Sequence, residues 1–212
     1  PDILNHPTRG AQATSVYQDA QKLLDEFENS NDLIPKAITG IFPAFAEEDD
    51  IIIKDRRIPF LRQQVKKGMG QSNYSLSDFI APVDSGKEDW IGAFVVSVFE
   101  SDSSELDDYQ RIMKKAIADR LVEACAEYIH EKVRKELWGY ANSERLSSDE
   151  LISEEYVGIR PAPGYPACPD HFGKYHIFEL LNASKAIGTE LTEHGAMNPP
   201  SSISGWIFSH PD

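Results

Sequence analysis

The segment that most constrains the fold is an apolar run from Trp90 to Phe99, in which Ser97 is the one polar residue. It is rich in β-branched and aromatic side chains, and it is apolar at odd and even positions alike, which is typical of a strand covered on both faces of a sheet. The run is about half of the roughly 20 residues that a membrane-spanning helix needs. We therefore predict a central, buried strand here and no insertion of the chain into a membrane.

A long helix is expected directly after this strand. Apolar side chains keep helical spacing over about residues 105–138, and Gly139 is suited to end the helix. At ~1.5 Å of rise per residue, such a helix would be roughly 50 Å long. Shorter helices are predicted over about residues 16–27, over 147–156, where Ser147 and Glu150 form a capping-box pattern, and over 175–187.

The remaining regular elements are predicted to be short. Two apolar runs, residues 37–42 and 51–54, indicate a pair of strands joined through Pro43 and an acidic turn, and residues 202–208 alternate as a strand does. Residues 58–67 are expected to form a short helix. This order of helices and strands is α+β rather than a regular βαβ series. No G-x-G-x-x-G sequence follows a strand, so a Rossmann-type nucleotide site is not indicated.

Composition excludes several classes of function. A formal net charge of -14 at pH 7 disfavours binding to a phosphate backbone, because that affinity depends on Lys and Arg. Two cysteines are too few for a disulfide framework, which favours a reducing, cytoplasmic compartment. The chain starts without Met and ends just after an apolar stretch, so we expect residues 1–212 to be one domain cut at both ends from a longer protein.

The candidate for chemistry is a loop over residues 158–171, which contains four prolines in the ten residues from Arg160 to Pro169. Each Pro fixes its own φ and keeps the preceding residue extended. The carbonyls of the loop should therefore not be hydrogen-bonded in a regular β-ladder, and they should be able to face a ligand. Gly164 permits close approach of the backbone, Tyr165 offers an aromatic face, and Arg160 offers a planar fork of donors. This set suits a small zwitterion such as S-adenosylmethionine, although the loop could also be a plain connector.

The loop carries a family resemblance. The pattern Arg160-x-x-x-Gly164-Tyr165-Pro166 resembles the R-x-x-x-G-Y-P signature of the S-adenosylmethionine-binding activation domain of cobalamin-dependent methionine synthase. Similar segments follow in the same order along nearly the whole chain: residues 40–44, 61–64, 78–82, 118–121, 127–128, 138–140, 158–169, 204–206 and 208–212.

The resemblance implies a C-shaped α+β domain with a twisted antiparallel sheet and flanking helices. It implies that Arg160 contacts S-adenosylmethionine, that Ala162 contributes backbone contacts, and that Tyr165 shapes the site together with Gly164 and Pro166. Cobalamin would be held by another domain, because no D-x-H-x-x-G motif is present. The family also uses an acidic residue upstream of Pro1 and a Tyr beyond Asp212, so we expect a partial pocket that binds the ligand more weakly.

A row of carboxylates follows the predicted long helix at i,i+4 spacing: Asp119, Glu123, Glu127 and Glu131. Such neighbours repel one another by ~0.2 to 0.5 kcal/mol per pair, which the nearby Lys115, Arg120, Arg134 and Lys135 would offset in part. The row is either a solvated face or a docking surface. The resemblance implies docking at Asp119 and Glu123, which would contact the cobalamin-binding domain and the His released from cobalt.

Cys168 and His171 suggest a metal site or a Cys-His nucleophile only weakly. Two ligands three residues apart do not make a structural zinc site, which needs four, and proximity in sequence does not make the two side chains face each other. We therefore expect no metal. A thiol or metal enzyme that uses these two residues is the third and weakest of the functions considered.

The resemblance also implies a mechanism. The complete enzyme would transfer a methyl group from methyltetrahydrofolate to homocysteine through methylcobalamin. This domain would support the repair of oxidised cobalamin, with an electron from a flavodoxin or a flavoprotein reductase and a methyl group from S-adenosylmethionine. We expect no catalytic side chain here and no activity of the 212 residues alone, because positioning accounts for the protein's part. The alternative is a non-catalytic acidic docking module for a flavodoxin-like electron donor.

Overall fold

The computed structural model describes residues 2–102 and 105–209 and contains a five-stranded antiparallel sheet in the order β3-β2-β1-β4-β7. The strands are β1 (Leu33–Glu47), β2 (Asp50–Ile53), β3 (Arg56–Pro59), β4 (Asp89–Glu100) and β7 (Ser202–Ile207). The longest pairing joins β1 to β4, from Leu33 opposite Glu100 to Ala44 opposite Asp89. The predicted central strand is confirmed, because β4 lies between β1 and β7.

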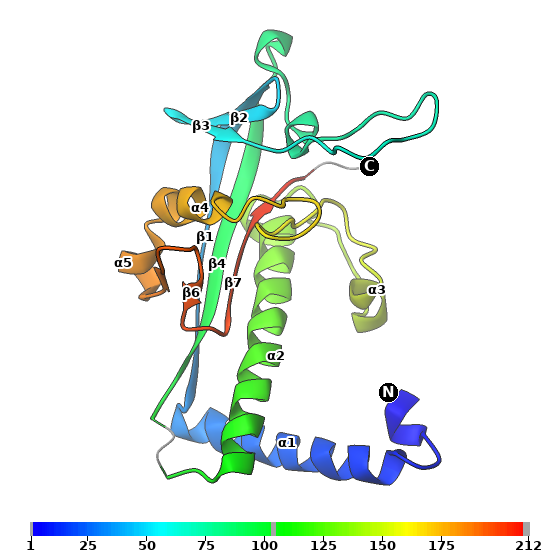
Figure 1. The fold of residues 1–212 in the computed structure, drawn as a ribbon, viewed down its shortest axis with the longest axis vertical. Helices are drawn as coiled ribbons and strands as arrows, with labels where there is room; N and C mark the ends of the chain where they lie inside the picture. The colour runs from blue at the N-terminus through cyan, green and yellow to red at the C-terminus, as the bar shows by residue number, and fades with distance from the viewer. Residues whose placement is uncertain (1, 103–104, 210–212) are drawn as a thin grey trace.

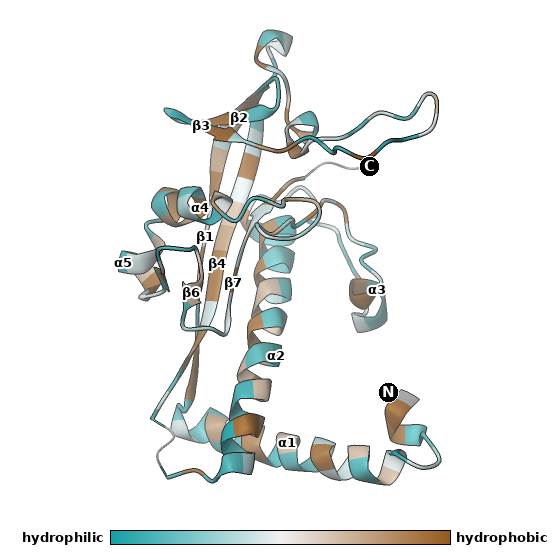
Figure 2. Cartoon of the chain, in the orientation of Figure 1, coloured by the Kyte–Doolittle hydropathy of each residue, from teal (hydrophilic) through white to brown (hydrophobic). Residues whose placement is uncertain are grey.

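Both faces of β4 are covered, as its largely apolar sequence requires. Side chains at alternate positions divide between two cores: Ile91, Ala93 and Val95 face one, and Phe94, Val96 and Val98 face the other. The first core includes α4 (Gly173–Leu181) and α5 (Ala183–Ile187), and the second includes α1 (Gly10–Ser30) and α2 (Asp108–Lys132). The domain therefore has three layers, with hydrophobic strands in the middle one (Figures 1 and 2).

The long helix is confirmed. Asp107 begins α2 with a capping box, in which its carboxylate accepts from the backbone N–H of Gln110 and the Gln110 side chain accepts from the N–H of Asp107. A π-helical turn, η4 (Val133–Leu137), continues the helix to Trp138. Gly139 follows with a φ of +78°, a conformation that glycine adopts at little cost.

Two sequence predictions need correction. The predicted helix over residues 175–187 is divided into α4 and α5, because Asn182 adopts a left-handed conformation with φ 52°. The predicted helix over residues 58–67 is wrong. Ile58 and Phe60 are both buried at a spacing of two, which suits a strand, and β3 therefore runs to Pro59. The chain beyond is an extended loop, in which Arg62 pairs with Asp49 and Asp78.

The smaller elements complete the chain. Ser147 caps α3 (Ser148–Ile152) with the predicted box, although this helix is shorter than expected. The expected break at Pro43 does not occur, because Pro is tolerated where a strand has a neighbour on one side only, and β2 joins β1 from Ala44 onward. The others are the 3-10 helices η1 (Asp2–Asn5), η2 (Leu76–Phe79) and η3 (Val83–Ser85), and a ribbon of β5 (Glu190–Leu191) and β6 (Met197–Asn198).

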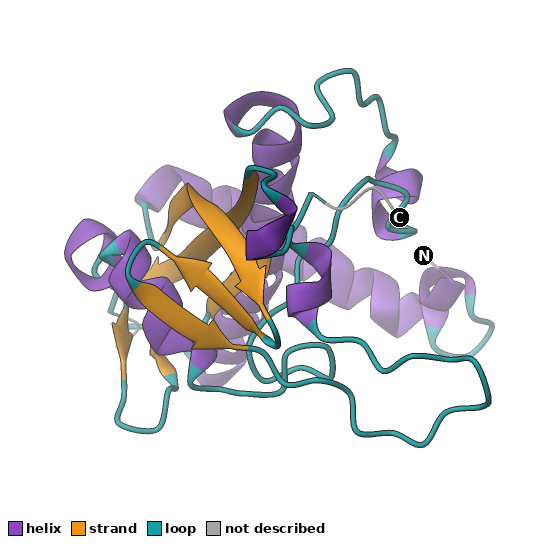
Figure 3. Ribbon diagram, turned by 90° about the horizontal axis from the view of Figure 1, so that it is seen from above, coloured by secondary structure: helices purple, strands orange, loops and turns teal. Residues whose placement is uncertain are grey.

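The overall outline is the predicted C shape. The β1–β4 ribbon and α2 form its long side, α1 projects from one end, and the loop over residues 61–75 projects from the other end on the same side (Figure 1). Seen from above, the strands are visibly twisted relative to one another (Figure 3). Within the described ranges, 2–102 and 105–209, no helix has both the length and the apolar character needed to cross a membrane.

Candidate functional site

The proline-rich loop is fastened to β7 along its first residues. The backbone N–H of Ile159 donates to the carbonyl of Phe208 at 2.9 Å, and the N–H of Phe208 donates back at 3.0 Å. The carbonyl of Pro161 accepts from the N–H of Trp206 at 2.9 Å. A Cβ at Gly205 would lie 2.9 Å from this carbonyl, so glycine permits the close approach. The expectation that the loop's carbonyls join no ladder is therefore wrong for its first residues.

Two tight turns shape the rest of the loop. The N–H of Tyr165 donates to Ala162 at 3.2 Å, and the N–H groups of Gly164 and Cys168 donate to Cys168 and Tyr165, each at 2.8 Å. Gly164 has a φ of +100°, and a Cβ there would lie 2.4 Å from the ring of His171. The position requires glycine for both reasons. Ala162 is half-buried, whereas Gly164, Tyr165 and Pro166 are exposed at the tip of the loop.

Arg160 points its side chain at α2. Its Nη2 forms an ion pair with Oε1 of Glu127, and 19% of the Arg160 side chain is exposed. Nη1 of Arg160 and Oε2 of Glu127 are enclosed by protein, and the described residues offer neither of them a hydrogen-bond partner. The sequence predicts a role for Arg160 but gives Glu127 no link to it, because the two residues are 33 positions apart.

A buried polar cluster extends from this ion pair along the end of α2. Arg134 is fully buried and forms two hydrogen bonds of 2.7 Å with Glu144. Its guanidinium lies 4.4 Å from the ring centre of Tyr156, and the ring of His130 meets the same Tyr156 edge-on at 4.9 Å. Arg134 does not lie on a solvated face, because it is buried and paired with Glu144. Its charge still adds to the hydrogen bond from Lys135 in lowering the pKa of Glu131, so it offsets part of the row as predicted.

Burial determines the protonation of this cluster. It lowers the pKa of His130 to about 2, and the positive charges of Arg134 and Arg160 act in the same direction. Burial also raises the pKa of Tyr140 and of Tyr156. At neutral pH the histidine is therefore uncharged and both tyrosines are protonated. The charge in the cluster lies on the two Arg–Glu pairs.

The acidic row on α2 is largely paired with other groups. Asp119 accepts a hydrogen bond of 2.7 Å from the hydroxyl of Ser201, and Glu123 forms an ion pair with Arg120 at 2.9 Å. Glu131 forms one with Lys135 at 2.8 Å. Along a helix, Asp119 and Glu123 lie about 12 and 6 Å from Glu127. The predicted docking residues and the predicted ligand-binding loop therefore meet on one helix, through Glu127 and Arg160.

Cys168 does not have the properties of a nucleophile. It is 6% exposed, and burial, together with the charge of Asp170, raises the pKa of its thiol to about 11. His171 packs instead against Gly164. The part of the chain that the structure describes contains no group of three or more His, Cys, Asp and Glu residues that could hold a metal ion.

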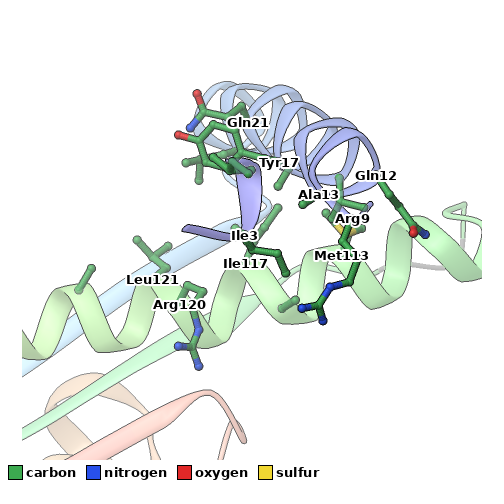
Figure 4. Close-up of a pocket in the computed structure, with 16 residues that line it drawn as sticks. Ile3, Arg9, Gln12, Ala13, Tyr17, Gln21, Met113, Ile117, Arg120 and Leu121 are labelled. Carbon is green, nitrogen blue, oxygen red and sulfur yellow. The ribbon is translucent and has the colours of Figure 1, made fainter. Parts of the chain in front are cut away.

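A cavity of about 910 Å³ lies elsewhere, between η1, α1 and α2. Figure 4 shows its apolar lining, to which Ala13 and Tyr17 of α1 and Met113, Ile117 and Leu121 of α2 contribute. No residue of the 158–171 loop lines it. The cavity is therefore separate from the predicted ligand site.

Comparison with known proteins gives two findings. A family model described as the activation domain of vitamin B12-dependent methionine synthase matches residues 1–212. A solved structure described as the MetH reactivation domain bound to AdoHcy has 49% sequence identity and a TM-score of 0.95, over 100% of this chain and 70% of that one. The chain belongs to the family of activation domains of vitamin B12-dependent methionine synthase.

Proposed function

We propose that this domain binds S-adenosylmethionine on the 158–171 loop and presents it to a cobalamin-binding domain of the same enzyme. The structurally similar MetH reactivation domain was solved with AdoHcy, which is S-adenosylmethionine without its transferable methyl group. The observation that carries the proposal is Arg160. Its backbone is fixed by β7, and its enclosed Nη1 has no partner among the described residues. An acceptor on a ligand would relieve the cost of that unpaired donor once the protein atoms that enclose it give way.

The other residues of the loop suit the remaining parts of the ligand. Arg160 would hold the carboxylate, and Ala162 and Gly164 would offer backbone groups at a close approach. Tyr165 is 67% exposed and presents a ring face of the kind that attracts a cation such as a sulfonium, with Pro166 beside it. Bound S-adenosylmethionine supplies a methyl group. Because the loop is held by hydrogen bonds before a ligand arrives, the protein's contribution is orientation.

The family supports a cobalamin-binding domain as one partner. A B12-dependent enzyme places cobalamin on a domain that must approach this one, and Asp119 and Glu123 on α2 are the residues that we propose for the contact. Glu123 is exposed, and its ion pair with Arg120 is a surface pair that is exchanged at little cost. We propose a flavodoxin or a flavoprotein reductase as the electron donor. A domain that only docks such a donor is not favoured, because the similar domain was solved with AdoHcy bound.

Calorimetric titration with S-adenosylmethionine tests the ligand and its location together. The chain should bind saturably, and Arg160→Ala should lose at least tenfold in affinity, because a charge-assisted contact contributes ~1.5 to 3 kcal/mol. Arg111→Ala is the matched control, since Arg111 is exposed and lies near the opposite end of α2. Equal affinities for the two variants would refute the assignment to the loop. Lack of binding by the unchanged chain would refute the function.

A further inference from the structure

Arg160 is held at two separate points. Its neighbours on both sides are hydrogen-bonded to the C-terminal strand and the residue after it, Pro161 to Trp206 of β7 and Ile159 to Phe208, which fixes the backbone at Arg160. The far end of its side chain is paired with Glu127 on α2. The two attachments come from different elements, which belong to a single packed unit because α2 and β7 share a core.

The segment of α2 that carries Glu127 is held in place by buried neighbours. Its helix neighbours Ala126, His130 and Val133 are buried at 2%, 0% and 0% exposure, so α2 cannot shift here without disturbing the core. The negative charge of Glu127 adds to burial in raising the pKa of the Tyr156 phenol. The Glu127 carboxylate therefore projects from a helix with a buried face toward Arg160.

We propose that Glu127 is a positioning residue for ligand binding: it holds the guanidinium of Arg160 in the orientation in which it meets the carboxylate of S-adenosylmethionine. This inference rests on the proposed function and adds a residue to it. Glu127 occupies one terminal nitrogen of the guanidinium, Nη2, and leaves the other, Nη1, without a protein partner among the described residues. Nothing in the proposal requires Glu127 to touch the ligand.

The physical basis is preorganisation. A free arginine side chain loses rotamer freedom when it binds a ligand, whereas a side chain already ordered by the protein has lost that freedom beforehand. The other members of the acidic row cannot perform this role, because Asp119, Glu123 and Glu131 are paired with Ser201, Arg120 and Lys135. Removing the charge of Glu127 while keeping its shape should release Arg160 without opening a cavity.

The test compares S-adenosylmethionine with its decarboxylated form, which lacks the group that Arg160 is expected to hold. Glu127→Gln should lower the affinity for S-adenosylmethionine about three- to tenfold, the range expected for the cost of ordering one long side chain. It should leave the affinity for the decarboxylated ligand unchanged. Glu131→Gln is the matched control on the same row and should change neither affinity. Adding Glu127→Gln to Arg160→Ala should produce no further loss, since the residue would have nothing left to position.

The outcomes separate the inference from the function on which it rests. Equal weakening of both ligands would show a general structural effect and overturn the inference, as would unchanged or tighter binding of S-adenosylmethionine by Glu127→Gln. A further loss in the double variant would also overturn it. If Arg160→Ala binds as well as the unchanged chain, the proposed function fails instead. Glu127→Asp keeps the charge on a shorter side chain, so its affinity for S-adenosylmethionine should lie between those of the unchanged chain and Glu127→Gln.

Discussion

His130 should make the stability of this domain depend on pH in a range that lies mostly above the titration of carboxylates. The imidazole is fully buried, and burial lowers its pKa from 6.5 to about 2. Below pH 6.5 the unfolded chain therefore takes up a proton at this residue, whereas the folded chain does not. The stabilisation is present above pH 6.5 and is lost as the pH falls from there.

The magnitude follows from proton linkage. Each pH unit below the unfolded pKa costs about 1.4 kcal/mol for one proton, so the free energy of unfolding should fall by about 2 kcal/mol between pH 7.5 and pH 5. At pH 5 the result is nearly the same for any folded pKa below about 4, because the folded imidazole is then uncharged throughout this range. The prediction therefore depends on burial and on the two neighbouring arginines rather than on a precise value.

Urea denaturation at pH 7.5 and pH 5 measures the contribution of His130 to the free energy of unfolding. His130→Phe keeps an aromatic ring against Tyr156 and removes the titrating nitrogen, so its free energy of unfolding should fall by about 2 kcal/mol less than that of the unchanged chain. His176 is also partly buried with a lowered pKa, but it is present in both proteins and cancels. Identical pH dependence in the His130 variant and the unchanged chain would refute the reasoning.

Three further outcomes are expected. Arg134→Met should lower the free energy of unfolding by about 3 to 5 kcal/mol, since it leaves Glu144 charged and buried without its partner, and a loss below 1 kcal/mol by urea denaturation would contradict this. Gly164→Ala should cost about 1 to 3 kcal/mol, because the loop requires φ +100°, and an unchanged melting temperature would show that the loop relaxes. Cys168 should resist alkylation at pH 7.5 in the folded chain and react once urea unfolds it, which peptide mass mapping can follow.

The sequence predicts the elements whose signals are local. The run from Trp90 to Phe99 has no polar face, so it had to be covered on both sides, and the apolar repeat over 105–138 is long enough to identify a helix. The region from Ile58 to Lys67 is mispredicted because its few apolar residues fit either spacing. Its conformation is decided by Arg62, whose partners Asp49 and Asp78 come from other parts of the chain.

The candidate site divides in the same way. Prolines and Gly164 identify the loop, because a single Pro or Gly is enough to restrict or permit a particular backbone conformation. The pairing of Arg160 with Glu127 depends on the fold that brings β7, the loop and α2 together, and no spacing rule predicts it. Arg134 shows most clearly what local sequence cannot predict, because its position on the helix is compatible with the surface and with the interior. It is buried because residues 140–156 return over the end of α2.

The long side of the C has a consequence for how its two ends are connected. β1 spans about 50 Å at ~3.4 Å per residue, and α2 with η4 spans about 45 Å beside it, so a strand ribbon and a helix of similar length brace each other from end to end. The two ends, from which α1 and the 61–75 loop project, are thus joined by two elements that pack against each other. Bending of this side would have to disturb the core that β4 and α2 share.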